Sequence, residues 1–257
     1  MTVKKQISYN LDPVTFARES LQFYPDPWQR DVLKYKGSKL IMLASRQSGK
    51  SAVAAVKALH RALFFPDSLI LLISPSMRQS QLIFRTIGKE MGKVSDQPKK
   101  VEDNKLSMTL ANGSRIVSLP SAEGTIRGYS SPDLIIIDEA SRVQDGIYYT
   151  LRPMMAISGG QLILLSTPNG RQGFFFEAWT KEDDWLKIKV TAAECPRISP
   201  EFLQQELETL GKWWCDQEYQ CVFVEGEDAV FRYEEIQRAF RDDYEGIKLW
   251  EDDQDGF

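Results

Sequence analysis

The segment Ala44–Ser51 constrains this chain more than any other, because it joins a strand pattern to a helix pattern through a glycine-containing turn. An apolar run, Leu40–Leu43, precedes it, and residues 52–63 follow with helical spacing. The inward N–H groups of such a turn, together with the positive end of the helix, bind anions such as phosphate. Ala44 replaces the first glycine of the usual G-x-x-x-x-G-K-[ST] pattern. The segment predicts a phosphate-binding loop, with an ordinary strand-to-helix turn as the alternative.

Three side chains of this loop have the chemistry that a bound nucleotide requires. We expect the Lys50 ammonium to reach the β- and γ-phosphates, and the Ser51 hydroxyl to contact Mg²⁺. Arg46 has a forked guanidinium that suits the γ-phosphate, although a surface arginine beside a strand is the alternative.

A second apolar run, Leu134–Ile137, ends in two adjacent carboxylates, Asp138 and Glu139. Such a run is typical of a buried parallel strand, and carboxylates at its end are costly to bury without partners or a function. In a nucleotide hydrolase, Asp138 would hold Mg²⁺ through water, opposite Ser51, and Glu139 would orient the attacking water. For the acid pair taken alone, a strand that exits to solvent or a structural ion pair is the alternative.

The chain has 257 residues, which suits one large α/β domain, or one domain with a small appendage. Its formal net charge of −4 shows that it is not a bulk polycation, so any DNA contact must come from a local basic patch. A solvated surface is the favoured interpretation of the basic residues that offer such a patch, namely Lys89, Lys93, Lys99, Lys100 and Arg115.

Cysteine and histidine usage argues against a zinc site, because the three cysteines form no C-x-x-C pair and His60 is the only histidine. An odd cysteine count without a signal sequence fits a reducing cytosol. No apolar run approaches the ~18 residues of a transmembrane helix.

Strand patterns alternate with helix patterns through most of the chain, which predicts a mainly parallel sheet with helices on both faces. The predicted strands are 69–74, 134–137, 161–166 and 185–190, the predicted helices are 77–91 and 146–156, and a hairpin pairs 105–110 with 114–119. From about Ser199 the pattern becomes helical, at 201–210 and 213–219, with a break near Gly211. Because ligands bind at the carboxyl ends of parallel strands, we expect Ser51, Asp138 and Ser166 at one edge of the sheet.

Together these segments resemble the ATPase domain of the large terminase subunit of tailed bacteriophages, over nearly the whole chain. The resemblance runs from about Pro25 to about Val224 and depends on the order of several motifs rather than on one of them. They are the adenine-contacting segment Tyr24–Arg30, the variant phosphate loop Ser45–Ser51, which often lacks the first glycine in this family, Ile126–Gly128, the acid pair Asp138-Glu139, and the coupling motif Leu165–Gly170.

The resemblance implies a P-loop NTPase fold of the ASCE type, with ATP and Mg²⁺ as ligands. It implies that Gln29 reads the adenine edge, although a helix-start residue after a Pro-Trp turn is the alternative. The implied nucleotide-binding residues are Gln29, Ser45, Arg46, Gln47, Ser48, Gly49, Lys50 and Ser51, and the implied metal-binding residues are Ser51 and Asp138. The implied catalytic residues are Glu139, Lys50, Arg46, Arg142 as a candidate for an arginine acting in trans, and Thr167 for coupling.

An arginine supplied across a subunit boundary often stabilises the transition-state charge in such enzymes. The candidates are Arg127, Arg142, Arg152 and Arg171, and a solvated surface charge is the alternative for each of them. Ser166 and Thr167 are expected to hydrogen-bond the attacking water or Glu139, or to act as plain strand-end caps.

The resemblance also implies a motor that hydrolyses ATP to drive double-stranded DNA into a preformed capsid. Its implied partners are a portal and the small terminase subunit, in a ring of subunits in the host cytoplasm. We expect an ATPase domain at 1–225 and a linker or acidic tail at 226–257, without the nuclease domain and DNA cleavage of complete large terminases. A superfamily 2 helicase or translocase and a non-hydrolysing nucleotide-binding scaffold are the alternatives.

Overall fold

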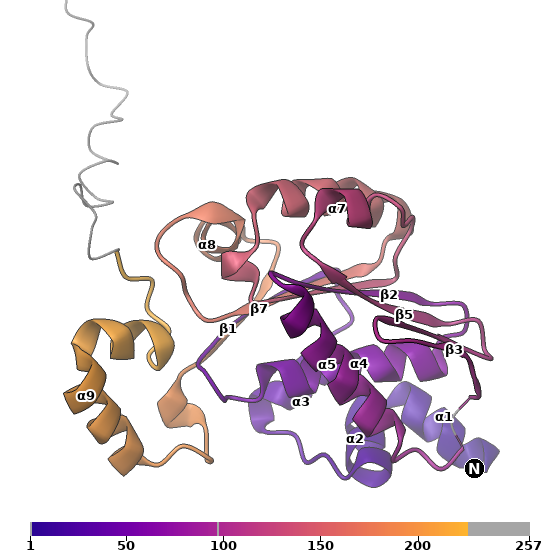
Figure 1. Ribbon diagram of the computed structural model, residues 1–257. Helices are drawn as coiled ribbons and strands as arrows, with labels where there is room; N and C mark the ends of the chain where they lie inside the picture. Colours follow the sequence, from indigo (N-terminus) through magenta and orange to yellow (C-terminus); the bar gives the residue numbers. More distant parts are fainter. Residues whose placement is uncertain (1, 97, 226–257) are drawn as a thin grey trace, which may run out of the picture. The chain divides into compact units, whose positions relative to one another are not determined.

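One eight-stranded sheet organises the computed structural model, which describes residues 2–96 and 98–225 (Figure 1). The strands are β1 (Lys39–Ala44), β2 (Leu69–Ser74), β3 (Lys100–Asp103), β4 (Ser107–Leu110), β5 (Arg115–Pro120), β6 (Leu134–Asp138), β7 (Gln161–Ser166) and β8 (Leu186–Val190). Their order in the sheet is β3-β4-β5-β2-β6-β7-β1-β8. The central strands are continuous apolar runs, as expected where helices cover both faces.

Six of the strands run parallel, and the edge formed by β3 and β4 is antiparallel. β2 pairs in parallel with β5 and β6, β7 pairs with β6 and β1, and β1 pairs with β8. The predicted hairpin is confirmed as β4 and β5, whose turn places Gly113 at φ +84°, a left-handed conformation that favours glycine. The mainly parallel α/β sheet is therefore the fold class that the sequence predicts.

Helices cover both faces of this sheet. The helices are α1 (Val3–Leu11), α2 (Pro13–Leu21), α3 (Pro27–Lys34), α4 (Lys50–Phe64), α5 (Met77–Met91), α6 (Glu123–Ile126), α7 (Asp145–Ser158), α8 (Gly173–Thr180) and α9 (Pro200–Glu218), with 3₁₀ turns at Ala140–Arg142 and Ala192–Glu194. Helices α1 to α5 share one buried apolar cluster with the sheet, and α6 to α8 share a second cluster on the opposite face (Figure 1). The sheet thus lies in the middle of three layers.

The strand order brings separate parts of the chain to one edge of the sheet. β7 lies between β1, which leads into the phosphate loop, and β6, which ends in Asp138. All three strands are parallel, so their carboxyl ends meet at the same edge. This is the strand arrangement of the predicted ASCE-type P-loop fold.

Most predicted elements are confirmed within a residue or two, including the strand at 69–74 and the helix at 77–91. The predicted break in the C-terminal helical segment is also confirmed, because Gly211 has φ +78° and ψ 169° inside α9. Helices α1, α2, α6 and α8 and strand β3 were not predicted, and α3 was considered only as the helix-start alternative for Gln29. The predicted linker or tail at 226–257 lies outside the described residues.

Candidate nucleotide site

The predicted phosphate loop forms a tight turn between β1 and α4. Ser48 closes it by donating its hydroxyl to the Ser45 carbonyl at 2.9 Å, and the Ser45 N–H donates to the Val190 carbonyl at 2.9 Å. Gly49 has φ +96°, and a Cβ there would lie 2.8 Å from the Gln29 Nε2 atom. The backbone angle therefore favours glycine at this position, and a side chain there would also displace the Gln29 amide.

Lys50 and Ser51 lie in the first turn of α4 and face the acid pair at the end of β6. The Ser51 hydroxyl donates to Asp138 Oδ2 at 3.2 Å, across 87 positions of the sequence. The Lys50 Nζ atom lies 4.0 Å from Glu139 Oε1, with only 9% of the lysine side chain exposed. The structure thus brings the two predicted motifs together into one site.

Asp138 is a buried carboxyl group whose charge is partly uncompensated. Burial, and then the adjacent Glu139 carboxylate, raise the pKa of Asp138 to about 6. Lys50 and the Ser51 hydroxyl act in the opposite direction. A bound cation would supply the missing positive charge, because a carboxylate oxygen beside a hydroxyl oxygen suits Mg²⁺, which retains several waters and substrate oxygens as ligands. The residues present therefore fit this ion.

The described residues offer no site that would hold a metal ion through protein ligands alone. Across the described part of the chain, no group of three or more His, Cys, Asp or Glu side chains converges in a way that would hold a metal. The Ser51–Asp138 pair thus suits a cation that arrives with its own water and phosphate ligands.

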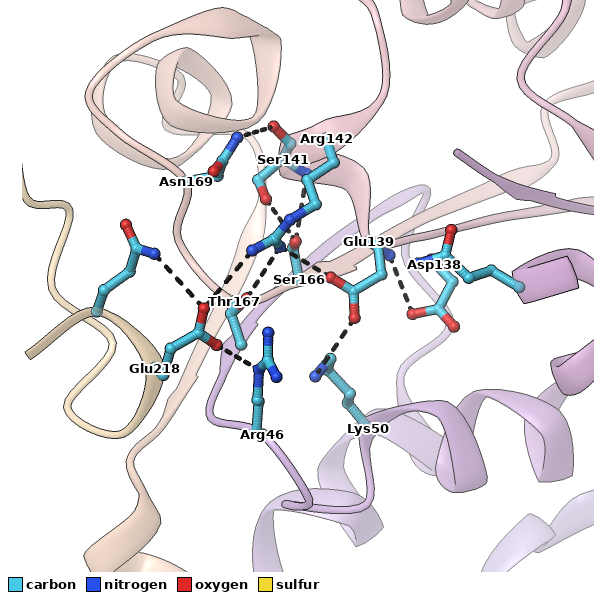
Figure 2. A network of polar contacts seen from close by, with 12 residues as sticks. Arg46, Lys50, Asp138, Glu139, Ser141, Arg142, Ser166, Thr167, Asn169 and Glu218 are labelled. Atoms are coloured by element: carbon cyan, nitrogen blue, oxygen red, sulfur yellow. Dashed lines mark hydrogen bonds and ion pairs between the residues drawn. The ribbon is translucent and has the colours of Figure 1, made fainter. Parts of the chain in front are cut away.

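Glu139 is held in a defined orientation by its own backbone and by Arg142. Its φ of +53° is left-handed, and its N–H donates to Asp138 Oδ1 at 3.0 Å. The Arg142 Nη1 atom donates to Glu139 Oε2 at 3.0 Å and to the Thr167 hydroxyl at 3.2 Å. The carboxylate of Glu139 therefore lies between a buried ammonium and a guanidinium, as Figure 2 shows.

The end of β7 connects to this arrangement through Arg142, whose guanidinium donates to both Thr167 and Glu139. The hydroxyl groups of Ser166 and Ser141 lie 2.7 Å apart, and Asn169 Nδ2 donates to the Ser141 carbonyl at 3.4 Å. The coupling segment is thus tied to the turn that follows the acid pair (Figure 2).

Arg46 contacts a partner that the sequence did not reveal. Its Nε atom donates to Glu218 Oε2 at 2.7 Å, and the Arg142 Nη2 atom lies 3.6 Å from Glu218 Oε1. The Glu218 side chain is only 6% exposed, whereas that of Arg46 is 62% exposed. In this conformation the Nε atom of Arg46 is bound to α9.

Gln29, the predicted adenine reader, lies beside the phosphate loop and is already hydrogen-bonded. Its Oε1 atom accepts from the Asp26 N–H at 2.9 Å as part of a capping box, and its Nε2 atom donates to the Gly49 carbonyl at 3.4 Å. This geometry corresponds to the helix-start alternative. A base would compete with these bonds or use the remaining N–H and lone pair of the Gln29 amide.

Arg197 is a second residue that the sequence did not single out. Its guanidinium pairs with both carboxylate oxygens of Asp26, at 3.3 and 2.7 Å, and donates to the Ser48 carbonyl at 2.8 Å. The partner carboxylate raises the pKa of Arg197. This residue links the phosphate loop to the start of α3.

The four candidate trans arginines lie in different surroundings. Arg142 contacts Glu139 of its own chain. Arg152 lies over the Tyr148 ring, Arg171 donates to the Phe223 carbonyl, and Arg127 is exposed. The geometry gives Arg142 a position within its own site, so its action in trans stays a prediction.

Fold and site together define a P-loop NTPase domain, with a phosphate loop on β1 and an acid pair on β6. Comparison with known proteins identifies the family. The sequence profile described as "Terminase large subunit, T4likevirus-type, N-terminal" matches residues 41–238, and the chain belongs to this family. The predicted resemblance is therefore confirmed.

Two relatives show the extent of the similarity. The chain is 23% identical to the large terminase subunit of Thermus phage G20c over 176 residues, which cover 61% of this chain and 36% of that protein. It is 26% identical to the large terminase subunit of Escherichia phage T5 over 194 residues, which cover 73% and 44%. The matches thus span less than half the length of these relatives.

Solved structures share the fold. The large terminase ATPase domain of Thermus phage P74-26 superimposes with a TM-score of 0.75 at 18% identity, covering 83% of this chain and 100% of that one. The large terminase of bacteriophage HK97 gives a TM-score of 0.60 at 19% identity, covering 85% and 50%. No described helix is long and apolar enough to cross a membrane.

Proposed function

We propose that this chain binds ATP with Mg²⁺ and hydrolyses it as the ATPase domain of a phage DNA-packaging motor. One observation carries the proposal: the Glu139 carboxylate is held between Lys50 and Arg142, next to the Ser51–Asp138 contact. Nucleotide as the ligand is supported by a further structural neighbour, the large terminase of a thermophilic bacteriophage, solved in complex with ADP and with ATP-gamma-S. Its complex with ADP has a TM-score of 0.61 at 11% identity, covering 84% of this chain and 53% of that one.

Each residue of the site has a role in this proposal. The loop N–H groups of residues 45–51 and the Lys50 ammonium hold the phosphates. Ser51 and Asp138 hold Mg²⁺, which neutralises phosphate charge when bound. Glu139 orients and polarises the attacking water, because its carboxylate is fixed but only partly buried.

The two arginines have different roles. Arg142 positions the Glu139 carboxylate and links it to Thr167, so that the end of β7 responds to changes at the acid pair. Arg46 contacts the γ-phosphate by exchanging Glu218 for the nucleotide, because the observed bond of its Nε atom holds the side chain toward α9. Gln29 reads the adenine edge by a similar exchange of hydrogen bonds.

The partners follow from the family and not from contacts of this chain. We propose double-stranded DNA as the substrate, a ring of subunits, and the portal and small terminase subunit as partners in the host cytoplasm. We propose no DNA cleavage by this chain. Of the basic residues considered for DNA, Lys93 pairs with Glu90 and Lys100 pairs with Asp103. These two pairings favour the solvated-surface interpretation for those lysines.

A scaffold that binds ATP without turnover is the remaining alternative, since the phosphate loop alone would serve it. The fixed Glu139 favours hydrolysis, because a binding site has no use for a carboxylate aimed near the phosphates. The helicase alternative is not favoured by the family match.

Phosphate release and nucleotide binding, measured at several protein concentrations, test the proposal. We expect wild type to bind and hydrolyse ATP, Lys50→Ala to lose binding, and Glu139→Gln to bind without releasing phosphate. Glu177→Gln is the matched control, because it removes a carboxylate that pairs with Lys181 on the surface, away from the site. This variant should behave like wild type. Comparable turnover in Glu139→Gln would overturn the role of Glu139. ATP binding without phosphate release by wild type at every concentration would favour the scaffold.

A further inference from the structure

Ser74, the last residue of β2, carries a buried hydroxyl group that lacks a hydrogen-bond partner. The residue is 0% exposed, and among the described residues no atom accepts from or donates to its Oγ. A buried polar group without a partner is destabilising, so its presence needs an explanation.

The sheet register places Ser74 beside Asp138. β2 pairs in parallel with β6, and the last paired positions are Leu72 opposite Ile136 and Ile73 opposite Ile137. We infer the placement of Ser74 next to Asp138 by continuing this register by one residue. Side chains at paired positions of neighbouring strands point to the same face, roughly 5 Å apart.

The face in question is the one that α4 covers. Leu72 and Ile136 both belong to the apolar cluster that the sheet shares with α4. Side chains two positions apart along a strand share a face, so Ser74 and Asp138 also point toward α4. The Ser51 hydroxyl reaches Asp138 from the first turn of that helix.

Asp138 has acceptor capacity left for another donor on this face. Its Oδ1 atom accepts from the Glu139 N–H, and its Oδ2 atom accepts from the Ser51 hydroxyl. A carboxylate has about four acceptor sites in total, so two of them have no bond to a described residue. A hydroxyl group next to it has one proton to donate and two lone pairs to accept.

We propose that Ser74 is a positioning residue of the magnesium site. When Mg²⁺ is bound, the Ser74 hydroxyl group would donate to the remaining acceptor capacity of Asp138 and so orient the carboxylate that holds the ion. The inference rests on the proposed function, because it assumes that Asp138 and Ser51 hold Mg²⁺. It explains why a hydroxyl group without a partner is retained at the end of an otherwise apolar strand.

Ser118 on β5 offers a matched control. It is also 0% exposed, its Oγ also lacks a partner among the described residues, and it pairs with Leu72 on the same face. However, β2 lies between β5 and β6, so Ser118 is separated from Asp138 by a whole strand. Removing either hydroxyl changes the same kind of buried group, but only Ser74 adjoins the proposed metal site.

The test uses Mn²⁺ as a spectroscopic probe of the magnesium site. Mn²⁺ is added to the full chain in the presence of a non-hydrolysable ATP analogue, and the free Mn²⁺ is measured by electron paramagnetic resonance. The proteins compared are wild type, Ser74→Ala, Ser74→Thr and Ser118→Ala. We expect Ser74→Ala to weaken Mn²⁺ binding about tenfold, the lower end for loss of a group that orients a metal ligand. Ser74→Thr, which keeps the hydroxyl group, should restore most of the affinity, and Ser118→Ala should match wild type.

Two further measurements separate positioning from a general structural effect. Binding of the analogue in the presence of a chelator, and the thermal unfolding midpoint, should be the same in Ser74→Ala and Ser118→Ala. Equal Mn²⁺ affinity in wild type and Ser74→Ala would overturn the inference, as would an equal loss in both alanine variants. Wild type that binds no Mn²⁺ with the analogue would instead contradict the proposed function.

Discussion

The Glu218 carboxylate accepts a hydrogen bond from the Arg46 guanidinium at 2.7 Å, although 172 positions separate the two residues. Glu218 is buried at the end of α9, and Arg46 lies inside the phosphate loop. The same carboxylate lies 3.6 Å from Arg142, which in turn holds Glu139. The end of α9 is therefore connected to both motifs of the nucleotide site.

The first prediction concerns Glu218→Gln, which removes the charge that competes with a γ-phosphate for Arg46. We expect this variant to prefer ATP over ADP about fivefold more strongly than wild type, because an ion pair with one largely exposed partner, here Arg46, contributes roughly 1 kcal/mol. Calorimetric titration with ADP and with a non-hydrolysable ATP analogue measures the preference.

Glu206→Gln is the control for this prediction. Glu206 lies on α9 and accepts a hydrogen bond from the hydroxyl group of Tyr219, the residue that follows this helix. In the described part of the chain, no bond joins Glu206 to the phosphate loop. It should leave the preference unchanged. An equal loss of affinity for both nucleotides in Glu218→Gln would mean that Glu218 supports the loop instead of competing for Arg46.

The second prediction distinguishes action of Arg142 within its own site from action in trans. Since Arg142 bonds Glu139 of its own chain, we expect Arg142→Ala to lower phosphate release about a hundredfold, the usual cost of one lost electrostatic contact. Mixing Arg142→Ala with Glu139→Gln should recover no activity, because neither chain has both residues. Recovery in the mixture would show that Arg142 serves a neighbouring site.

The third prediction compares two glycines with left-handed backbone angles. Gly49 has φ +96° with Gln29 against it, whereas Gly159 has φ +61° and open space around it. Both alanine variants should lose about 1–2 kcal/mol of stability from backbone strain. Only Gly49→Ala should also lose nucleotide affinity, and equal affinity in the two variants would show that the loop tolerates a side chain.

The central strands and the phosphate loop were predictable because their signals are local. β2 and β7 are apolar runs bounded by polar residues, and the acid pair directly follows β6. Contacts made by α9 were not predictable, since nothing near Arg46 in the sequence points to Glu218. The proximity of two residues that lie far apart in the sequence becomes visible only in the folded structure.

Some missed elements nevertheless had a local signal. Asp12-Pro13 and Asp26-Pro27 both begin helices, α2 and α3, with an aspartate as the N-cap and proline in the first turn. β3 had no such signal, because all four of its residues are exposed and all but Val101 are charged. Its pairing with β4 at the edge of the sheet defines it.

The fourth prediction concerns His60, the only histidine of the chain. Burial lowers the pKa of His60 to about 4, against the hydrogen bond between its Nε2 atom and the Tyr9 carbonyl at 2.8 Å. Its ring packs against Phe16, Phe64 and Phe65. The folded chain therefore holds His60 neutral at pH values where an unfolded chain protonates it.

The sign of the resulting pH dependence follows from the number of bound protons. Between the unfolded pKa of about 6.5 and the folded pKa of about 4, the unfolded state binds more protons, so stability falls as the pH falls. The loss is complete below pH 4 and amounts to at most about 3.5 kcal/mol, since one pKa unit corresponds to about 1.4 kcal/mol. Above pH 6.5 the group contributes no pH dependence.

Two measurements check this prediction. The single imidazole resonance, followed by nuclear magnetic resonance, should titrate near pH 4. The free energy of unfolding is compared with that of His60→Phe, which keeps an aromatic ring but has no titrating group. Between pH 6.5 and 5 the wild type should lose stability relative to this variant, whereas the raised pKa of Asp138 stabilises both proteins over the same interval. An imidazole that titrates near pH 6.5 in the folded chain would show that His60 is accessible to water and does not penalise folding at acid pH.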